Sequence, residues 1–466
     1  MSVPPPDDHN ENISPADAAD TADAQGDAVP AGTSGASGTS GASGASGNAI
    51  SVPVLQRSRR DWIACGTIAA VSLIGVLGVM ISAPINDATL TVNNANYVEP
   101  PEIPLVAGEY SEAWRAPADT INPTPTVLNG LVISTQEADG KTTISALEAS
   151  NGSAVWSYTR DVPLCSLSDA WNTVVADYRT GVGCGDVVSI NADSGTYNAT
   201  RSALASTDVV PVSSNDRVGI VSKERVELWR SDMVRTVEYG DVSAKSEPEQ
   251  QPHEECEISS ALTRTELLAV VEACPNGDDT YEYVRLQKAT PEESRKPEVT
   301  SEILLSGRGN QIVAIGENAV AIYSPSSSSI ISYNDKGEIN GEYPVDEAPL
   351  VQETKGVFGA QVADLPHNMS WFDGKHLYLF MPSNLEVTHK FDDAIGTGVA
   401  LSGSLVYPTR TGLNVANWDT GEIIRSVAID RGGYSGPVSL GATGSAIVEK
   451  RGNEVVGLLP AGTPTS

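Results

Sequence analysis

The chain has 466 residues, 40% of them hydrophobic, and its 60 acidic residues against 29 Lys and Arg residues give a net charge of −31. This composition is typical of a soluble body and excludes a protein with many membrane-spanning segments. The negative charge disfavours binding to nucleic acid or to anionic lipid surfaces, so we expect no nucleic-acid partner.

The first 56 residues have the composition of a disordered arm. Residues 1–56 contain seven acidic residues and no Lys or Arg, and they include a Gly/Ser/Ala/Thr repeat at 31–48. Such a segment has too little apolar surface to build a core, so we expect it to be disordered. Its role is open between recruitment of a cytoplasmic partner and a solvated tail with no fixed role.

Residues 57–84 have the pattern of a membrane anchor with a basic flank. Their central part, 62–83, is 22 residues long and carries no charge. As a helix it would span about 33 Å, which is enough to cross the hydrocarbon core of a bilayer. Cys65 lies at the start of this apolar run, whereas the lipid-acceptor cysteine of a lipoprotein follows it. We therefore interpret Cys65 as a passive membrane residue.

Charges on the two sides of the anchor predict its orientation. Arg57, Arg59 and Arg60 stand immediately before the apolar run, whereas the first charge after it is Asp87. The positive-inside rule therefore places the N-terminus in the cytoplasm and the C-terminal domain outside the cell membrane. A cleaved signal peptide is the alternative, but the leader of roughly 60 residues is long for one.

The rest of the chain reads as a stalk, an all-β domain and a short tail. Residues 85–108 contain three prolines near their end and read as an extended stalk. In 109–460, short β-rich runs alternate with Gly, Asn, Asp and Ser turns, which is an all-β pattern. We expect residues 461–466 to be frayed.

A repeated turn identifies the all-β domain as a β-propeller. A turn ending in glycine recurs at Gly152, Gly195, Gly337 and Gly421, and Trp156 follows the first of them by four residues. The first two glycines are 43 residues apart and the last two are 84 apart, which is twice 42. This period matches one four-stranded blade. We count eight blades, and seven is the alternative because the sixth is irregular.

The last blade has only three strands at the C-terminal end of the domain. Residues 109–116 can supply the fourth strand from the start of the domain. That pairing would close the ring and remove the exposed edges of an open array.

Four cysteines beyond the anchor fit the same scheme. Cys165 and Cys184 are 19 residues apart, and Cys256 and Cys274 are 18 apart. In the propeller scheme each pair joins the beginning of a first strand to a point at or just past the end of the second strand, so we favour these two disulfides among three pairings. An oxidising compartment agrees with a domain outside the membrane. Metal binding is the alternative, but CxxC spacing is absent and His253 is the only nearby histidine.

The residues at 146–156 resemble a known repeat. They fit A-x-D-x-x-T-G-x-x-x-W with Glu148 for Asp and Asn151 for Thr, and Thr420 with Gly421 match without the Trp. The domain thereby resembles PQQ-like β-propeller repeat proteins, which include BamB-like proteins, and the acidic leader with a signal anchor resembles actinobacterial envelope proteins. The resemblance implies a Trp that docks on the next blade.

The resemblance does not imply a bound quinone. Quinoprotein dehydrogenases of this fold carry a pair of adjacent cysteines, and this chain has no Cys-Cys pair and no CxxCH. We therefore expect no cofactor, and PQQ in particular is disfavoured.

No residue is predicted to be catalytic or to bind a metal or a cofactor. His367, His376 and His389 fall in the sixth blade without an evident third ligand, so we interpret them as surface or turn residues. Several tryptophans either form a ligand cage or pack between blades, and we favour packing. They are Trp114, Trp156, Trp171, Trp229, Trp371 and Trp418.

We therefore expect a membrane-anchored scaffold that binds protein partners of cell-envelope biogenesis or transport. A PQQ-dependent dehydrogenase and a sensor of a small ligand are the alternatives. Function has to be argued from a site, and the sequence alone shows none.

Overall fold

The computed structural model of the chain describes residues 58–94, 96–100, 108–181, 183–204, 206–366, 368–444 and 446–461. The expected disordered arm, residues 1–56, lies outside the described residues, as does nearly all of the expected tail. The chain divides into two units, Met1–Leu73 and Ile74–Ser466.

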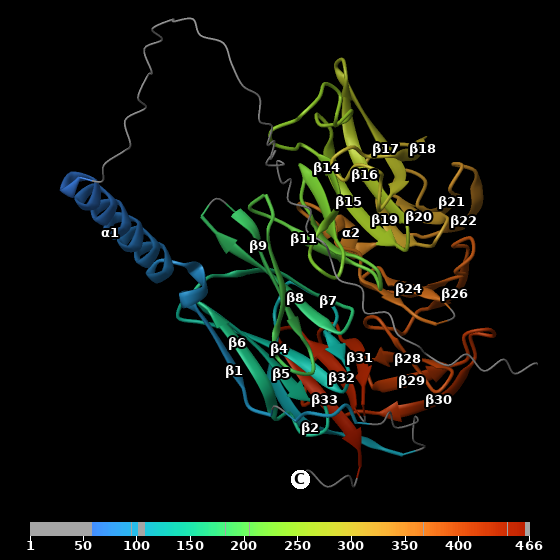
Figure 1. Ribbon diagram of the computed structural model, residues 1–466. Helices are drawn as coiled ribbons and strands as arrows, with labels where there is room; N and C mark the ends of the chain where they lie inside the picture. Colours follow the sequence, from blue (N-terminus) through green and yellow to red (C-terminus); the bar gives the residue numbers. More distant parts are fainter. Residues whose placement is uncertain are drawn as a thin grey trace, which may run out of the picture. The chain divides into compact units, whose positions relative to one another are not determined.

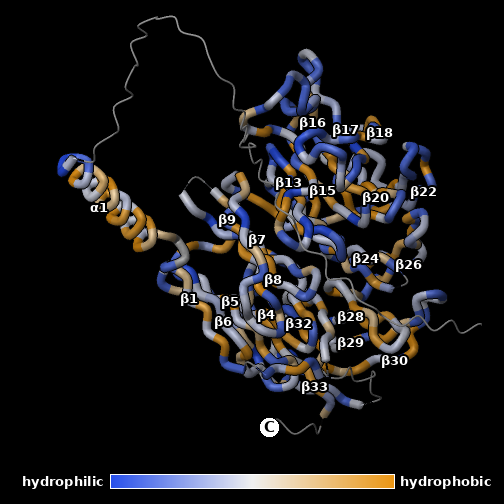
Figure 2. Tube along the Cα trace, viewed as in Figure 1, coloured by the Kyte–Doolittle hydropathy of each residue, from blue (hydrophilic) through white to orange (hydrophobic). Residues whose placement is uncertain are grey.

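Helix α1 (Arg59–Ile81) corresponds to the predicted anchor, and Figure 2 shows apolar residues along most of its length. Ser58 and Asp61 cap its start: the Asp61 backbone N–H donates to Ser58 Oγ (3.3 Å), and the Ser58 N–H donates to Asp61 Oδ2 (2.7 Å). Among the described residues, α1 is the one helix long and apolar enough to cross a membrane. A short 3₁₀ helix, η1 (Pro84–Asp87), follows it.

The described chain beyond η1 forms eight antiparallel sheets, and Figure 1 shows them following one another around a ring in sequence order. We number them as blades 1 to 8. Blade 1 contains β1 (Ala88–Val92), β3 (Val127–Leu128), β4 (Leu131–Ala138), β5 (Lys141–Glu148) and β6 (Ala154–Arg160), and blade 2 contains β7 (Leu164–Ala170), β8 (Thr173–Thr180), β9 (Gly183–Asn191) and β10 (Tyr197–Ser202). Blade 3 contains β11 (Val210–Ser213), β12 (Val218–Val221), β13 (Arg225–Trp229) and β14 (Arg235–Gly240). Blade 4 contains β15 (Glu257–Arg264), β16 (Leu267–Asn276), β17 (Asp279–Lys288) and β18 (Val299–Leu304).

Blades 5 to 8 continue the ring and include one short helix, α2 (Pro349–Glu353), before blade 6. Blade 5 contains β19 (Gln311–Ile315), β20 (Ala319–Ser324), β21 (Ser329–Asn334) and β22 (Ile339–Pro344), and blade 6 contains β23 (Val362–Asp364), β24 (Met369–Phe372), β25 (Leu377–Phe380) and β26 (Val387–Phe391). Blade 7 contains β27 (Val399–Leu401), β28 (Ser404–Thr409), β29 (Gly412–Ala416) and β30 (Ile423–Ala428). Blade 8 contains β31 (Ser439–Thr443), β32 (Ala446–Arg451), β33 (Glu454–Pro460) and β2 (Tyr110–Pro117). The predicted eight-bladed propeller is confirmed.

The ring closes in blade 8, where β2 pairs with β33 although they lie at opposite ends of the domain. The predicted closing strand is therefore confirmed. Ion pairs support the closure: Arg115 contacts Glu454 (3.2 Å) and Arg451 contacts Glu112 (3.1 Å). Because β2 covers β33, blade 8 has no missing outer strand.

Part of the predicted stalk belongs to the first blade. Strand β1 lies within residues 85–108 and pairs antiparallel with β6, with Leu90 opposite Tyr158. The stalk interpretation is wrong for this stretch. The alternation of its apolar residues, Ala88, Leu90 and Val92, is a strand pattern, and the outer strand of a blade offers free backbone groups for it.

The core consists of apolar layers between successive blades rather than one central core. For example, Trp156 and Tyr158 of blade 1 pack with Tyr178 and Ile190 of blade 2. Similar clusters join blade 2 to 3, 3 to 4, 4 to 5 and 6, 6 to 7, 7 to 8, and 8 to 1. Each blade is therefore stabilised by both neighbours.

The repeat anchors mark one contact that recurs between blades. The indole of Trp156 in blade 1 lies against Gly195 in blade 2, and its Nε1 donates to the carbonyl oxygen of Ala192 (2.6 Å). Gly195 has φ +64°, and an added Cβ would lie 2.6 Å from the ring. In the same position, Ile303 of blade 4 lies against Gly337, and His389 of blade 6 lies against Gly421.

Candidate functional site

A cavity of about 420 Å³ lies where the first strands of blades 1 to 4 meet. Its wall includes β7 and β11 residues and the segment 359–362, which leads into the first residue of β23 in blade 6. The residues just before this segment reach blade 4: the Phe358 N–H donates to the Ser259 carbonyl oxygen (2.7 Å), and Phe358 forms a parallel bridge with Ser260. The connection from α2 to β23 therefore lies across the inner strands.

Asp169 is the one titratable side chain among the described residues that line this cavity. Burial raises the pKa of Asp169 to about 6. A general acid–base pair needs two groups with separated pKa values, and the wall supplies one. We therefore assign no acid–base chemistry to this cavity.

A larger cavity, of about 590 Å³, lies among blades 6, 7 and 8. We call it the blade 6–8 cleft. It is formed by the β24–β25 and β28–β29 turns and by the connections between these blades, so one end of the ring supplies its walls. Its lining residues are Phe372, Gly374, Lys375, Asp392, Asp393, Ala394, Ile395, Thr409, Arg410, Thr411, Asn414, Ser426, Ser435, Gly436 and Pro437.

A hydrogen-bond network fixes the carboxylate of Asp393 in the cleft. The Tyr407 hydroxyl donates to Asp393 Oδ1 (2.9 Å), and Asn414 Nδ2 donates to Oδ2 (2.8 Å). Ser426 Oγ in turn donates to Asn414 Oδ1 (2.6 Å), which orients the amide. Burial raises the pKa of Tyr407, so its hydroxyl stays protonated and continues to donate.

Buried charges hold the β28–β29 turn, which carries Arg410, against blade 8. The guanidinium of Arg431 donates to the carbonyl oxygens of Thr409 (2.6 Å) and Gly412 (3.0 Å), one on each side of the turn. The same guanidinium pairs with Glu449 of β32 (2.7 Å), and both side chains are almost fully buried. The turn is therefore fixed by backbone contacts rather than left as a free loop.

Two other charged residues of the cleft already have partners. Lys390 pairs with Asp392 (2.8 Å), and this hydrogen bond lowers the pKa of the Asp392 carboxyl. Lys375 lies 3.7 Å from Glu347. Within each pair the two opposite charges neutralise each other.

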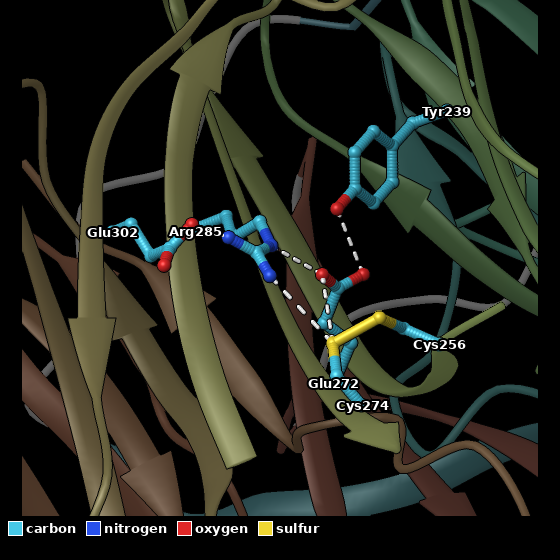
Figure 3. Close-up of a disulfide and its surroundings, with 6 residues drawn as sticks. All are labelled: Tyr239, Cys256, Glu272, Cys274, Arg285 and Glu302. Carbon is cyan, nitrogen blue, oxygen red and sulfur yellow. Dashed lines mark hydrogen bonds and ion pairs between the residues drawn. A yellow bond between two sulfur atoms is a disulfide. The ribbon is translucent and has the colours of Figure 1, made fainter. Parts of the chain in front are cut away.

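Figure 3 shows the second disulfide, Cys256–Cys274, beside a buried charged cluster. Tyr239 donates its hydroxyl proton to Glu272 Oε2 (2.8 Å), and Arg285 pairs with the other oxygen of that carboxylate. Burial raises the pKa of Glu272, whereas Arg285 and Tyr239 oppose the rise. This cluster crosses from blade 3 to blade 4.

The first disulfide, Cys165–Cys184, lies in blade 2 beside Asp177. Both predicted disulfides are therefore formed. Cys184 is the second residue of the third strand, β9, four residues past the end of β8, which agrees with the predicted position just past the end of the second strand. It reaches the first strand because both strands are irregular there: the pairing register shifts at Cys165 in β7 and beside Arg179, the partner of Cys184.

Two groups of side chains have metal-ligand spacing: Cys165, Cys184 and Asp177, and a second group of His253, Cys256 and Glu272. The cysteines in both groups are bonded in disulfides, so they offer no thiolate ligand while those bonds are intact. We assign no metal to either group.

The histidines and tryptophans in the described part of the chain do not line the cleft. His376 lies in the β24–β25 turn beside the buried Asp373 (3.0 Å), and His389 lies in β26, whereas His367 is outside the described residues. Trp156, Trp229 and Trp371 are fully buried and pack in the core, as predicted for packing residues.

The sequence reasoning missed Asp393 and Arg410. The signal available was a pair of charged turns, Asp-Asp after β26 and Thr-Arg-Thr between β28 and β29. Neither turn has a motif that singles it out, since their proximity depends on the pairing of two blades.

The sequence matches no protein-family model, and no curated protein sequence matches it. Solved structures are similar to the fold. The computationally designed Ika8 protein has 14% identity and a TM-score of 0.46, over 75% of this chain and 99% of that chain. A protein of unknown function from Bacteroides caccae has 12% identity and a TM-score of 0.30 over 60% and 92%, and a chain of the Mitotic Checkpoint Complex has 11% and 0.40 over 73% and 93%. No function is carried over from them.

Proposed function

We propose that the chain is a membrane-anchored scaffold outside the cytoplasmic membrane and that its propeller binds a protein partner in cell-envelope biogenesis or transport. The blade 6–8 cleft is the observation that carries this proposal. Three blades form it at one end of the ring, and Asp393 is held there by neutral donors. The proposal includes neither catalysis nor a bound cofactor.

The distribution of charged side chains in the propeller supports a binding surface at the blade 6–8 cleft. Four described arginines that contact carboxylates are buried and serve the fold: Arg160, Arg285, Arg431 and Arg451. A partner protein can recognise exposed charged side chains that form no ion pair within the propeller. An open cleft of about 590 Å³ has room for a short segment of that partner.

The proposed location rests on the charges around α1 and on the disulfides. Arg59 and Arg60 begin the helix, and the positive-inside rule keeps this end in the cytoplasm. Disulfides persist in oxidising compartments, which agrees with a propeller on the other side.

Orientation is tested by labelling intact cells with a membrane-impermeant maleimide. Asp335, in an exposed turn of blade 5, is replaced by Cys in a chain that carries Cys65→Ala. We expect labelling without permeabilisation. Labelling only after permeabilisation would place the propeller in the cytoplasm and reject the location.

Partner binding is tested by photocrosslinking in cells. A photoreactive residue replaces Thr411, which is exposed in the cleft, and a control replaces Lys336, which is exposed in the β21–β22 turn. We expect a discrete crosslinked protein from the Thr411 position alone. Identical crosslinks, or none, from the two positions would reject the cleft as the binding surface.

A further inference from the structure

Asp393 and Arg410 are neighbours on two adjoining segments of the cleft wall. Ala394 and Thr409 form an antiparallel bridge, and the Ile395 N–H donates to the Pro408 carbonyl oxygen (3.0 Å). The next pair along this ladder is therefore Asp393 opposite Arg410. Directly opposite residues of an antiparallel pair have Cβ atoms roughly 5 Å apart.

Neither side chain forms an ion pair within the described part of the chain, with the other or with a third residue. Asp393 accepts hydrogen bonds only from the neutral Tyr407 and Asn414, and no ion pair with it is formed among the described residues. Arg410 is exposed and makes no hydrogen bond or ion pair within the described part of the chain. A fixed carboxylate and a free guanidinium thus stand side by side.

A ligand with one charge would satisfy one of these groups and repel the other. A ligand that presents a cation and an anion a few ångströms apart would satisfy both, because the cation would meet Asp393 and the anion would meet Arg410. Adjacent hydroxyls of a sugar would also suit a carboxylate and a guanidinium. Sugar sites, however, use an exposed aromatic face, and the aromatic ring in the lining, that of Phe372, is 2% exposed.

We propose that the blade 6–8 cleft binds an extended peptide segment of the partner in which a basic and an acidic residue are two positions apart. In an extended segment such residues point to the same side, about 7 Å apart, and their long side chains can reach the adjacent side chains of Asp393 and Arg410. The basic side chain pairs with Asp393 and the acidic one pairs with Arg410. This inference rests on the proposed function, since it names what the partner presents.

The fold supports this site from behind. Arg431 and Glu449 fix the turn that carries Arg410, and Asn414 with Tyr407 fixes Asp393. The binding groups are therefore placed before the peptide arrives, so less conformational freedom is lost on binding. Because both ion pairs lie at an open surface, salt weakens them.

The test uses the full-length chain in lipid nanodiscs and fluorescence anisotropy of a labelled, end-capped peptide GSGKSEGSG. We expect binding that weakens as salt rises. Peptides GSGQSEGSG and GSGKSQGSG, which lack one charge each, are expected to bind about tenfold more weakly, since hydrogen bonds to charged groups contribute in this range. Equal affinity of all three peptides would overturn the proposal.

Matched variants locate the binding. Asp393→Asn keeps an oxygen that accepts hydrogen bonds, and Arg410→Gln replaces the charged guanidinium by a shorter, neutral amide that still donates hydrogen bonds. We expect each to weaken binding of GSGKSEGSG about tenfold, while Arg308→Gln, at an exposed arginine outside the cleft, leaves it unchanged. Unchanged binding in the two cleft variants would overturn the proposal. Unfolding transitions at the wild-type temperature confirm that the variants are folded.

Two further results separate this inference from the proposed function. Competition by free lysine or glutamate as strong as by the peptide would show a small zwitterion as the ligand and overturn the peptide assignment. If the crosslink from Thr411 persists in the Asp393→Asn, Arg410→Gln double variant, the scaffold function stands and the ionic recognition falls. Loss of the crosslink in that variant supports both.

Discussion

Trp114 packs its indole ring on Gly152, and this contact joins the closing strand of blade 8 to blade 1. Its Nε1 donates to the carbonyl oxygen of Ala149 (2.9 Å). The geometry repeats that of Trp156 on Gly195 one blade later. The ring therefore closes with the same contact that joins its first two blades.

Replacement of Gly152 by alanine separates the clash with Trp114 from the strain that any alanine suffers at a positive φ. Gly152 and Gly140 have φ of +75° and +76°, but an added Cβ at 152 would lie 2.9 Å from Trp114, whereas one at 140 meets nothing within 4 Å. We expect Gly140→Ala to lower the free energy of unfolding by about 1 kcal/mol and Gly152→Ala by about 3 kcal/mol. Urea unfolding measures both, and equal losses would contradict the packing role of Trp114.

The repeated turns could be predicted from the sequence because glycine at a positive φ leaves a local mark. Gly152, Gly195, Gly337 and Gly421 recur at blade spacing, and the closing strand followed from counting. The contact of His389 with Gly421 could not be predicted, since nothing in the sequence identifies an imidazole as the residue that replaces Trp.

The cleft could not be predicted because its residues come from three blades. Asp393 and Arg410 are separated by a whole strand pair, and their proximity follows from a bridge outside the regular strands. The placement of β1 was missed for a related reason. Prolines downstream suggested a stalk, while pairing with β6 depends on a free outer edge that only the folded blade presents.

Asp119 and Lys450 form a buried ion pair (3.1 Å) where β32 meets the chain that enters blade 1, with side chains 6% and 4% exposed. Burial lowers the pKa of Lys450, and Asp119 opposes this. We expect Asp119→Asn to lower the free energy of unfolding by about 3–5 kcal/mol, because it leaves a buried ammonium without an anion.

The double variant Asp119→Asn, Lys450→Met is the control for this prediction, since it removes both charges. It should recover much of the lost stability, as measured by chemical denaturation. Lys450→Met alone completes the comparison. A loss of stability in the double variant equal to the sum of the losses in Asp119→Asn and Lys450→Met would show that the two residues do not interact.

We expect Glu272 to contribute more to the stability of the folded chain than the Tyr239 hydroxyl that donates to it. Glu272→Gln leaves the buried Arg285 with only the half-exposed Glu302, so we expect a loss of about 3 kcal/mol. Tyr239→Phe removes one hydrogen bond to the same carboxylate, and we expect a loss of about 1–2 kcal/mol. Thermal unfolding with intact disulfides measures the stability of both variants. A larger loss in Tyr239→Phe than in Glu272→Gln would contradict the stabilising role of the buried ion pair.

Asp177 should make stability depend on pH near neutrality. The carboxyl is 1% exposed, and burial raises its pKa to about 7, with Asp186 and Glu227 adding to the rise and the Gly185 N–H and Arg179 opposing it. Between pH 4 and 7 the folded chain therefore holds a proton that the unfolded chain releases. The contribution of this group is complete below about pH 4 and is lost as the pH rises through about 7.

Asp177→Asn keeps an oxygen for the Gly185 N–H (2.6 Å) and cannot ionise, so it removes this dependence. We expect the variant to gain about 3 kcal/mol relative to wild type between pH 4.5 and 8, measured as the change in the free energy of unfolding in urea. Asp335→Asn, at an exposed turn, should follow wild type at every pH. If the free energy of unfolding of Asp177→Asn shows the same pH dependence as that of wild type, the prediction is wrong. The buried carboxyl would then be ionised in the folded chain throughout this pH range and would cause no change of stability with pH.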